Sequence, residues 1–151
     1  MSSTNDTGIV ADRASGRTGR THRYRSLVGV GLLAALVAMV VTTLAAALAR
    51  AAGVDFEIPD GGEKIPLGGF AFLTGVFSVA GVVIAVAFLR WSARPADRFV
   101  WTTVALTAMS MVPPLLSGAD AATIAALLAL HLVPAAVMIP TLARSLRART
   151  G

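Results

Sequence analysis

Four long windows without a single charged residue constrain this chain more than any other feature. None of the 13 basic and eight acidic residues falls in residues 27–49, 67–89, 99–119 or 121–143. At about 1.5 Å rise per residue, a helix of such length reaches roughly 34 Å and crosses a hydrocarbon core of about 30 Å. The windows therefore predict a small multi-pass membrane protein.

Composition agrees with this class and excludes several others. Hydrophobic residues make up 56% of the 151 residues and charged residues only 14%, which is far from an ordinary soluble domain. Cysteine is absent, so a disulfide-stapled secreted scaffold is excluded. The hydrophobic content also excludes a chain that is disordered throughout.

The basic residues predict which way the chain faces. Eleven of the 13 precede the first window, join the second to the third or follow the fourth: Arg13, Arg17, Arg20, Arg23, Arg25, Arg90, Arg94, Arg98, Arg144, Arg147 and Arg149. The opposite side carries Arg50, Lys64, Asp55, Glu57, Asp60, Glu63 and Asp120. The positive-inside rule then predicts that both termini lie in the cytoplasm and that the protein is in the cell membrane. Tyr24, Trp91 and Trp101 fall at the predicted inner boundary, where aromatic residues are enriched, which agrees with this orientation.

These patterns predict an all-α fold, an antiparallel up-down-up-down bundle of four membrane helices. Its membrane domain is residues 27–144, with spans at 27–49, 67–89, 99–116 and 121–143. We expect residues 1–26 to be a disordered basic cytoplasmic tail and residues 145–151 a second basic tail, both attracted to anionic lipids rather than to nucleic acid. A cleaved signal peptide is the disfavoured alternative, because signal cores run about 7–15 residues.

The segment between the first two spans has a pattern of its own. Arg50 near the end of the first span and Gly53 beyond it are typical of a helix C-terminus with a left-handed glycine cap. Apolar and acidic residues then alternate over residues 54–58, with the period of a strand. We expect an extended strap over the helix ends, with Val54, Phe56 and Ile58 facing down; a docking surface for a cationic partner is the alternative.

Small residues recur at helical spacing in the first two spans. The first stripe is Gly31, Ala35, Ala38, Thr42 and Ala46, and the second is Ala71, Gly75, Ser78 and Val82. Such stripes let helix backbones approach closely in a membrane, so we expect them to pack within one bundle rather than to form a homodimer motif.

The third span carries a proline pair near its outer end. Pro113 and Pro114 remove two backbone donors, so a regular helix is expected from Phe99 to about Val112, followed by a kink or an irregular turn. A re-entrant segment would instead put the basic C-terminus outside, against the charge rule. Asp120 then precedes the fourth span and is expected to cap it, accepting from Thr123 or a neighbour.

One ionisable residue lies inside a predicted span. His131 is close to the middle of the fourth span, and Thr103, Thr107 and Ser110 form a hydroxyl stripe at comparable depth on the third. An ionisable residue at this depth suggests a functional polar site for a small molecule, an ion or a proton. The favoured alternative is a neutral imidazole bonded to a hydroxyl or to a carbonyl freed by Pro134, because no carboxylate partner is present.

No catalytic constellation is visible in the sequence. No acidic residue lies within a span, cysteine is absent, and no phosphate-binding glycine loop or nucleophile motif occurs. His22 lies in the predicted tail and cannot join His131 as a second haem ligand. We therefore expect no enzyme activity, no cofactor and no metal.

The chain also resembles a known family. The motifs are the loop Arg50-Ala51-Ala52-Gly53-Val54-Asp55-Phe56-Glu57-Ile58-Pro59 and, in the fourth span, His131-Leu132-Val133-Pro134 and Met138-Ile139-Pro140-Thr141-Leu142-Ala143-Arg144. They resemble a family of small actinobacterial four-helix membrane proteins of unknown function over roughly residues 27–144. The resemblance implies four spans and an envelope location, and carries no activity.

Two hypotheses of function follow. The first is a non-enzymatic accessory or structural component of the envelope that binds lipid or a larger membrane partner. The alternative is a small transporter or channel whose path is lined by His131 and the hydroxyl stripe. Four spans rarely enclose a path, so this alternative requires a homo-oligomer.

Overall fold

The computed structural model describes residues 6–57 and 64–150, with side chains from Thr21 onward. Within these residues the chain is all helical apart from turns and one isolated bridge, which confirms the predicted fold class. The helices are α1 (Asp6–Ala51), α2 (Leu67–Trp91), α3 (Pro95–Ser110), α4 (Val112–Leu116) and α5 (Ala121–Thr150). Four stretches are long and apolar enough to span a membrane: Thr21–Ala51, Leu67–Trp91, Pro95–Leu116 and Ala121–Thr150.

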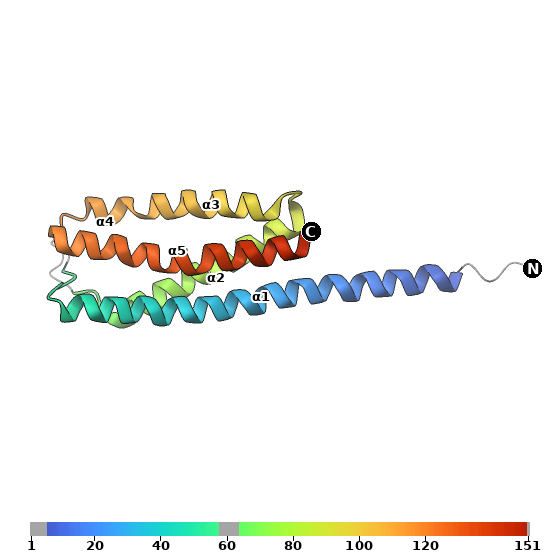
Figure 1. Cartoon of the computed structure of the whole chain (residues 1–151), viewed down its shortest axis with the longest axis horizontal. Helices are drawn as coiled ribbons and strands as arrows, with labels where there is room; N and C mark the ends of the chain where they lie inside the picture. The colour runs from blue at the N-terminus through green and yellow to red at the C-terminus, as the bar shows by residue number, and fades with distance from the viewer. Residues whose placement is uncertain (1–5, 58–63, 151) are drawn as a thin grey trace, which may run out of the picture.

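The long helices form an antiparallel ring (Figure 1). Helix α1 packs between α2 and α5, and α3 packs against α5 and α2. Helices α1 and α3 lie on opposite corners of the ring and make no contact, whereas α2 and α5 touch across the other diagonal. Each helix therefore packs beside its neighbour in sequence, as short connections require.

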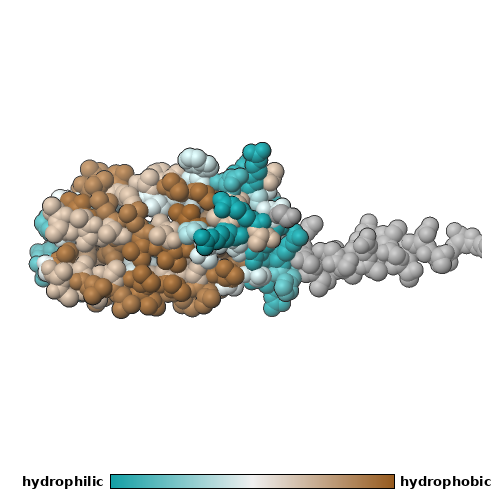
Figure 2. Space-filling model, in the orientation of Figure 1, coloured by the Kyte–Doolittle hydropathy of each residue, from teal (hydrophilic) through white to brown (hydrophobic). Residues whose placement is uncertain are grey.

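Large apolar side chains cover the outside of the bundle, and its interior combines small residues with larger ones such as Phe99, Leu142 and Leu146. The buried set includes Ala34, Ala35, Ala38, Ala46, Ala85, Ala96 and Ala143, while Leu33, Leu48, Phe72 and Phe77 are exposed. Figure 2 shows a hydrophobic band between two hydrophilic ends, the more extensive at the end from which α1 projects. The exposed apolar side chains suit a bundle whose solvent is lipid, and the buried alanines allow the close helix packing on which association in a membrane depends.

The predicted small-residue stripe of the first span is the buried face of α1. All five of its members are buried: Gly31, Ala35, Ala38, Thr42 and Ala46. At Gly31 a Cβ atom would lie 2.5 Å from Cγ2 of Val82, so α1 and α2 approach too closely there for any side chain. At Gly75 it would lie 3.0 Å from Sδ of Met39. The stripe thus packs within the bundle, as expected.

Helices α1 and α5 extend beyond the predicted spans. Helix α1 begins at Asp6, whereas the sequence predicted a disordered tail up to residue 26, and it projects well past the bundle in Figure 1. Helix α5 continues to Thr150, through the segment predicted as a separate C-terminal tail. Once a helix is nucleated each added residue contributes one hydrogen bond, so helices formed by the apolar spans continue into their Arg-rich flanks.

The third span breaks where the proline pair predicted. Helix α3 starts at Pro95, four residues before the predicted start, and ends at Ser110, after which Met111 turns and α4 begins at Val112. Pro113 has no N–H, so the Met109 carbonyl lacks its usual helical donor. The N–H of Met111 donates to the carbonyls of Ala108 and Met109, so the Met109 carbonyl still accepts a hydrogen bond. The segment crosses the bundle with this break and is not re-entrant (Figure 1).

The connection after α1 is a tight cap followed by a strap. Gly53 has φ of +95°, the Val54 N–H donates to the Ala49 carbonyl at 3.0 Å, and the Gly53 N–H donates to the Arg50 carbonyl at 2.9 Å. These two bonds form a Schellman motif, which confirms the glycine cap.

Phe56 anchors the strap to the end of the bundle opposite the one from which α1 projects. Its ring is fully buried and meets that of Phe70 edge to face, with the centroids 5.1 Å apart. Asp55 and Glu57 are exposed on either side, so the predicted alternation is confirmed over residues 54–57. Lys64 lies beside the strap. Its ammonium group pairs with the Asp55 carboxylate at 3.2 Å, and its backbone forms an isolated antiparallel β-bridge with Glu57. Ile58, Asp60 and Glu63 lie outside the described residues.

Candidate functional site

His131 lies on α5 and bonds within its own helix. Its Nδ1 is 2.8 Å from the Leu127 carbonyl oxygen, and the side chain is half-buried. A carbonyl only accepts, so Nδ1 is the donor of this bond. The carbonyl that Pro134 would free is that of Leu130, so the predicted bonding to a backbone carbonyl occurs at a different residue.

The three hydroxyls of α3 are bonded in the same local manner. Thr103 donates to the Phe99 carbonyl at 2.7 Å, Thr107 to that of Thr103 at 2.8 Å, and Ser110 to that of Thr107 at 2.8 Å. These i−3 and i−4 bonds satisfy each hydroxyl without a second helix.

Helices α3 and α5 pack against each other, yet the structure places no hydrogen bond between His131 and this stripe. The described residues contain no group of three or more His, Cys, Asp or Glu side chains able to hold a metal ion. His131 Nδ1 and the three hydroxyls of α3 each bond to a carbonyl of their own helix, which is compatible with a packing role.

Other hydroxyls are buried deeper than the predicted stripe. Thr42, Thr74 and Ser78 lie inside the bundle, on the helices α1 and α2, and Thr123 is buried at the start of α5. The Oγ1 atom of Thr42 finds no hydrogen-bond partner within the described part of the chain. Sequence reasoning counted Thr42 and Ser78 only as small residues. The two small-residue stripes could have predicted that these hydroxyls are buried, because a polar side chain on the packed face of a helix is buried with that face.

Asp120 caps α5 as predicted. Its Oδ1 accepts from the N–H groups of Ala122 at 2.9 Å and Thr123 at 3.0 Å. The Thr123 side chain, followed by the Thr123 backbone N–H, lowers the pKa of the Asp120 carboxyl below its ordinary value. The backbone N–H of Thr123 has hydrogen-bond geometry toward the Asp120 carboxylate, whereas the Thr123 hydroxyl does not. Asp120 therefore has a structural role that accounts for an acid next to a membrane span.

Arginines join α1 to α5 at the opposite end of the bundle. Arg149 donates from Nε to the Arg23 carbonyl at 3.2 Å and from Nη2 to the Ser26 hydroxyl at 2.9 Å. Arg23 returns the contact, donating from Nη1 to the Arg149 carbonyl at 3.2 Å. Each guanidinium is held by neutral oxygens, so this end keeps its positive charge.

The chain matches one family model. A family of unknown function (DUF6069) matches residues 22–148, which is consistent with the resemblance inferred from the sequence. No curated protein and no solved structure matches the chain. Since the match covers residues 22–148, most of the chain, the protein belongs to DUF6069, a family of unknown function.

Proposed function

We propose that this chain is a non-enzymatic accessory or structural component of the cell membrane that binds lipid or a larger membrane partner. The observation that carries the proposal is the apolar outer surface of the bundle. Large apolar residues cover the outside, while His131 and the α3 hydroxyls bond to their own helices. The outer surface and the charged ends are thus the parts available for interaction. An actinobacterial origin is part of this proposal and rests on the resemblance alone.

The charge distribution supports cytoplasmic termini. Arg23, Arg90, Arg94, Arg98 and Arg147 are exposed at the end of the bundle from which α1 projects, which Figure 2 shows as hydrophilic. The other end carries the exposed acids Asp55, Glu57 and Asp120. A basic end of this kind faces the cytoplasm and its anionic lipids, and anionic lipid rather than nucleic acid is the expected partner.

The state of assembly tests the proposal. The full chain, extracted in a mild detergent, is measured by native mass spectrometry. We expect a monomer that retains lipid, or one that carries a foreign subunit. A closed homo-oligomer that conducts ions or solutes in liposomes would instead support the transporter and contradict an accessory role.

A substitution at His131 separates packing from transport. His131→Phe removes the bond to Leu127 and keeps a ring of similar size, so expression and helix content should be retained with a stability loss of about 1 kcal/mol. The measurement is thermal unfolding in detergent, with Thr107→Val as the matched change on α3. Loss of a cellular phenotype by a well-folded His131→Phe protein would contradict the packing role.

A further inference from the structure

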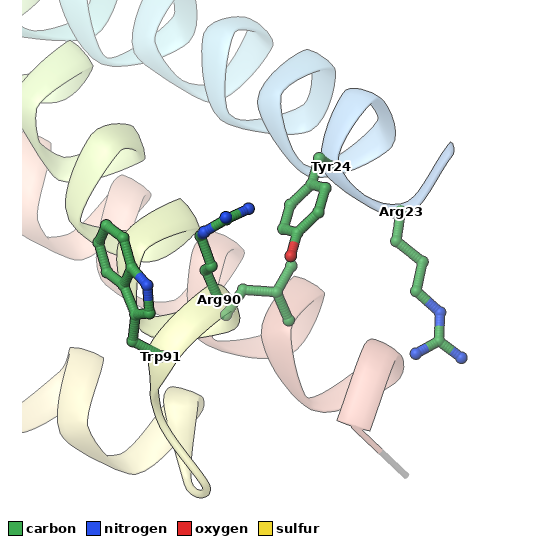
Figure 3. Close-up of a pocket in the computed structure, with 5 residues that line it drawn as sticks. Arg23, Tyr24, Arg90 and Trp91 are labelled. Atoms are coloured by element: carbon green, nitrogen blue, oxygen red, sulfur yellow. The ribbon is translucent and has the colours of Figure 1, made fainter. Parts of the chain in front are cut away.

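A basic hollow opens between α1 and α2 at the end from which α1 projects. It encloses about 460 Å³ and is lined by Arg23, Tyr24, Leu89, Arg90 and Trp91. Figure 3 shows Tyr24 reaching from α1 toward Arg90 of α2, with Trp91 beside Arg90 and Arg23 at the far edge. Every polar group that these side chains contribute is a hydrogen-bond donor, although the phenol can also accept. The hollow therefore matches a ligand that is rich in acceptor oxygens.

The positive charge of this hollow is not neutralised by a carboxylate. The one ion pair among the side chains described, those of residues 21–57 and 64–150, joins Lys64 to Asp55 at the other end of the molecule. Arg90 contacts the Trp91 ring, with its guanidinium carbon 5.8 Å from the centroid. A cation–π contact of this length leaves the N–H groups of the guanidinium available to other acceptors. Two guanidinium groups thus border one hollow without an anion.

The position of the hollow indicates what kind of acceptor reaches it. Leu89 is the last apolar residue of the second charge-free window and Arg90 follows it, so the hollow sits where the hydrophobic band meets the basic end. Trp91 is 76% exposed at this boundary, as membrane-interface tryptophans are. Lipid phosphates lie at the same depth, with their acyl chains along the apolar surface.

We propose that this hollow binds the phosphate group of an anionic phospholipid. Arg90 holds the phosphate oxygens through its N–H groups and Tyr24 donates from its hydroxyl, while Arg23, which already donates to the Arg149 carbonyl, adds positive charge at the edge of the hollow. Trp91 fixes the orientation of Arg90 and marks the depth of the headgroup. The inference rests on the proposed function and deepens it, since it assigns the lipid to one site instead of to a diffuse basic surface.

A neighbouring hollow provides the matched control. It encloses about 720 Å³ between α2 and α3, and its lining includes Arg94, Arg98 and Trp101 together with the carboxylate of Asp97. An acid within the lining weakens phosphate binding there. Arg98→Gln therefore removes the same charge from the same end of the molecule without touching the proposed site.

The test measures lipid retained by the full chain in mild detergent. Native mass spectrometry counts adducts of phosphatidylglycerol and phosphatidylcholine supplied at equal concentration. We expect wild type to retain phosphatidylglycerol preferentially, and Arg90→Gln to weaken that binding about tenfold, as for one charge-assisted hydrogen-bonded contact. Arg98→Gln should change it by less than about twofold, because Arg98 does not line the proposed site and acts on it only through screened attraction.

Three results would overturn the assignment. They are equal losses in Arg90→Gln and Arg98→Gln, equal retention of the two lipids by wild type, and displacement of phosphatidylglycerol by millimolar inorganic phosphate, which would identify a free-phosphate site. If Arg90→Gln does not fold, as judged by circular dichroism, Arg90→Lys keeps the charge without the planar fork and should still weaken binding. A homo-oligomer that conducts would contradict the proposed function whatever the lipid counts show, so the two failures remain distinguishable.

Discussion

Thr42 places a hydroxyl inside the bundle, where no described partner reaches it. The residue is 2% exposed, and its Oγ1 atom makes no hydrogen bond within the described residues. A polar atom that is buried without a partner costs roughly 1–3 kcal/mol, whereas a methyl group of the same size costs nothing of this kind. Threonine is nevertheless compatible with the site because it is small enough for the stripe along which α1 packs.

Thr42→Val is therefore expected to stabilise the protein by about 1 kcal/mol. Valine keeps the shape of the side chain and removes the desolvated hydroxyl. The check is the midpoint of thermal unfolding in detergent. Thr43→Val is the control, because the Thr43 hydroxyl donates to the Met39 carbonyl at 2.7 Å and its loss should not stabilise. A lower midpoint for Thr42→Val would mean that the hydroxyl has a partner in the folded protein.

Asp120 links stability to pH through the cap of α5. Its pKa is lowered in the folded protein, so the ionised carboxylate stabilises the fold above the unfolded pKa of about 3.9. That contribution is lost as the pH falls through the lower folded value. Asp120→Ala should thus destabilise at pH 7 and have a much smaller effect at pH 3.

The control at this site is Asp120→Asn, which can still accept from the N–H groups of Ala122 and Thr123. It should retain most of the stability at pH 7 and lose the dependence on pH that comes from the carboxyl. Thermal unfolding at the two pH values measures both effects. An alanine variant that is equally destabilised at both would show that ionisation of Asp120 does not contribute.

At the scale of an element, α1 owes its position to one face of small residues. The closest approach is at Gly31, where a Cβ atom would lie 2.5 Å from Cγ2 of Val82 and 3.3 Å from Cδ2 of Leu142. Valine is stiff about χ1 and Val82 is itself buried, so it cannot swing aside freely. Helix α1 is held against both of its neighbours at this level.

Gly31→Ala should accordingly destabilise the bundle by about 1–3 kcal/mol through overpacking. Gly29→Ala is the matched control, since nothing lies within 4 Å of its Cβ position and alanine favours helix. Unfolding midpoints of the two variants in the same detergent decide the matter. Val82→Ala combined with Gly31→Ala should recover part of the loss, and an equal response of the two glycines would contradict the close approach.

At the scale of the whole molecule, the two ends of the bundle differ in charge, and that difference predicts its orientation. A fluorescent reporter fused after Gly151 should be active in the cytoplasm. A phosphatase inserted within residues 60–64 should be active outside, because the loop follows the first span. Cells carrying each fusion give the measurement by fluorescence and by phosphatase activity. The opposite pattern would overturn the orientation, and moving each reporter to the other position supplies the control.

Much of this fold followed from short-range pattern. The four spans, the break before Pro113, the glycine cap at Gly53 and the aspartate cap at Asp120 each depend on residues within a few positions of one another. Local rules suffice there because the bonds involved are local. The extents of α1 and α5 did not follow, since charge and hydropathy mark the limit of the lipid and not the end of a helix.

The candidate site could be predicted only in part. The sequence placed His131 and the α3 hydroxyls at one depth, but depth does not decide whether a side chain bonds across helices or back to its own. In the structure the carbonyl one turn earlier is near every such donor, and that bond forms wherever packing allows it. The arginine contacts between α1 and α5 were likewise absent from the pattern, because they join residues more than 120 positions apart.

The sequence by itself determined that the chain crosses a membrane four times, because a charge in hydrocarbon is costly and none of the four windows contains one. It also determined which face of α1 packs, since only small residues allow close approach. The tertiary structure decided which helices are neighbours, that Phe56 closes the end opposite the projecting part of α1, and that Arg23 and Arg90 border one hollow. These depend on contacts between residues distant in sequence, which no local pattern encodes.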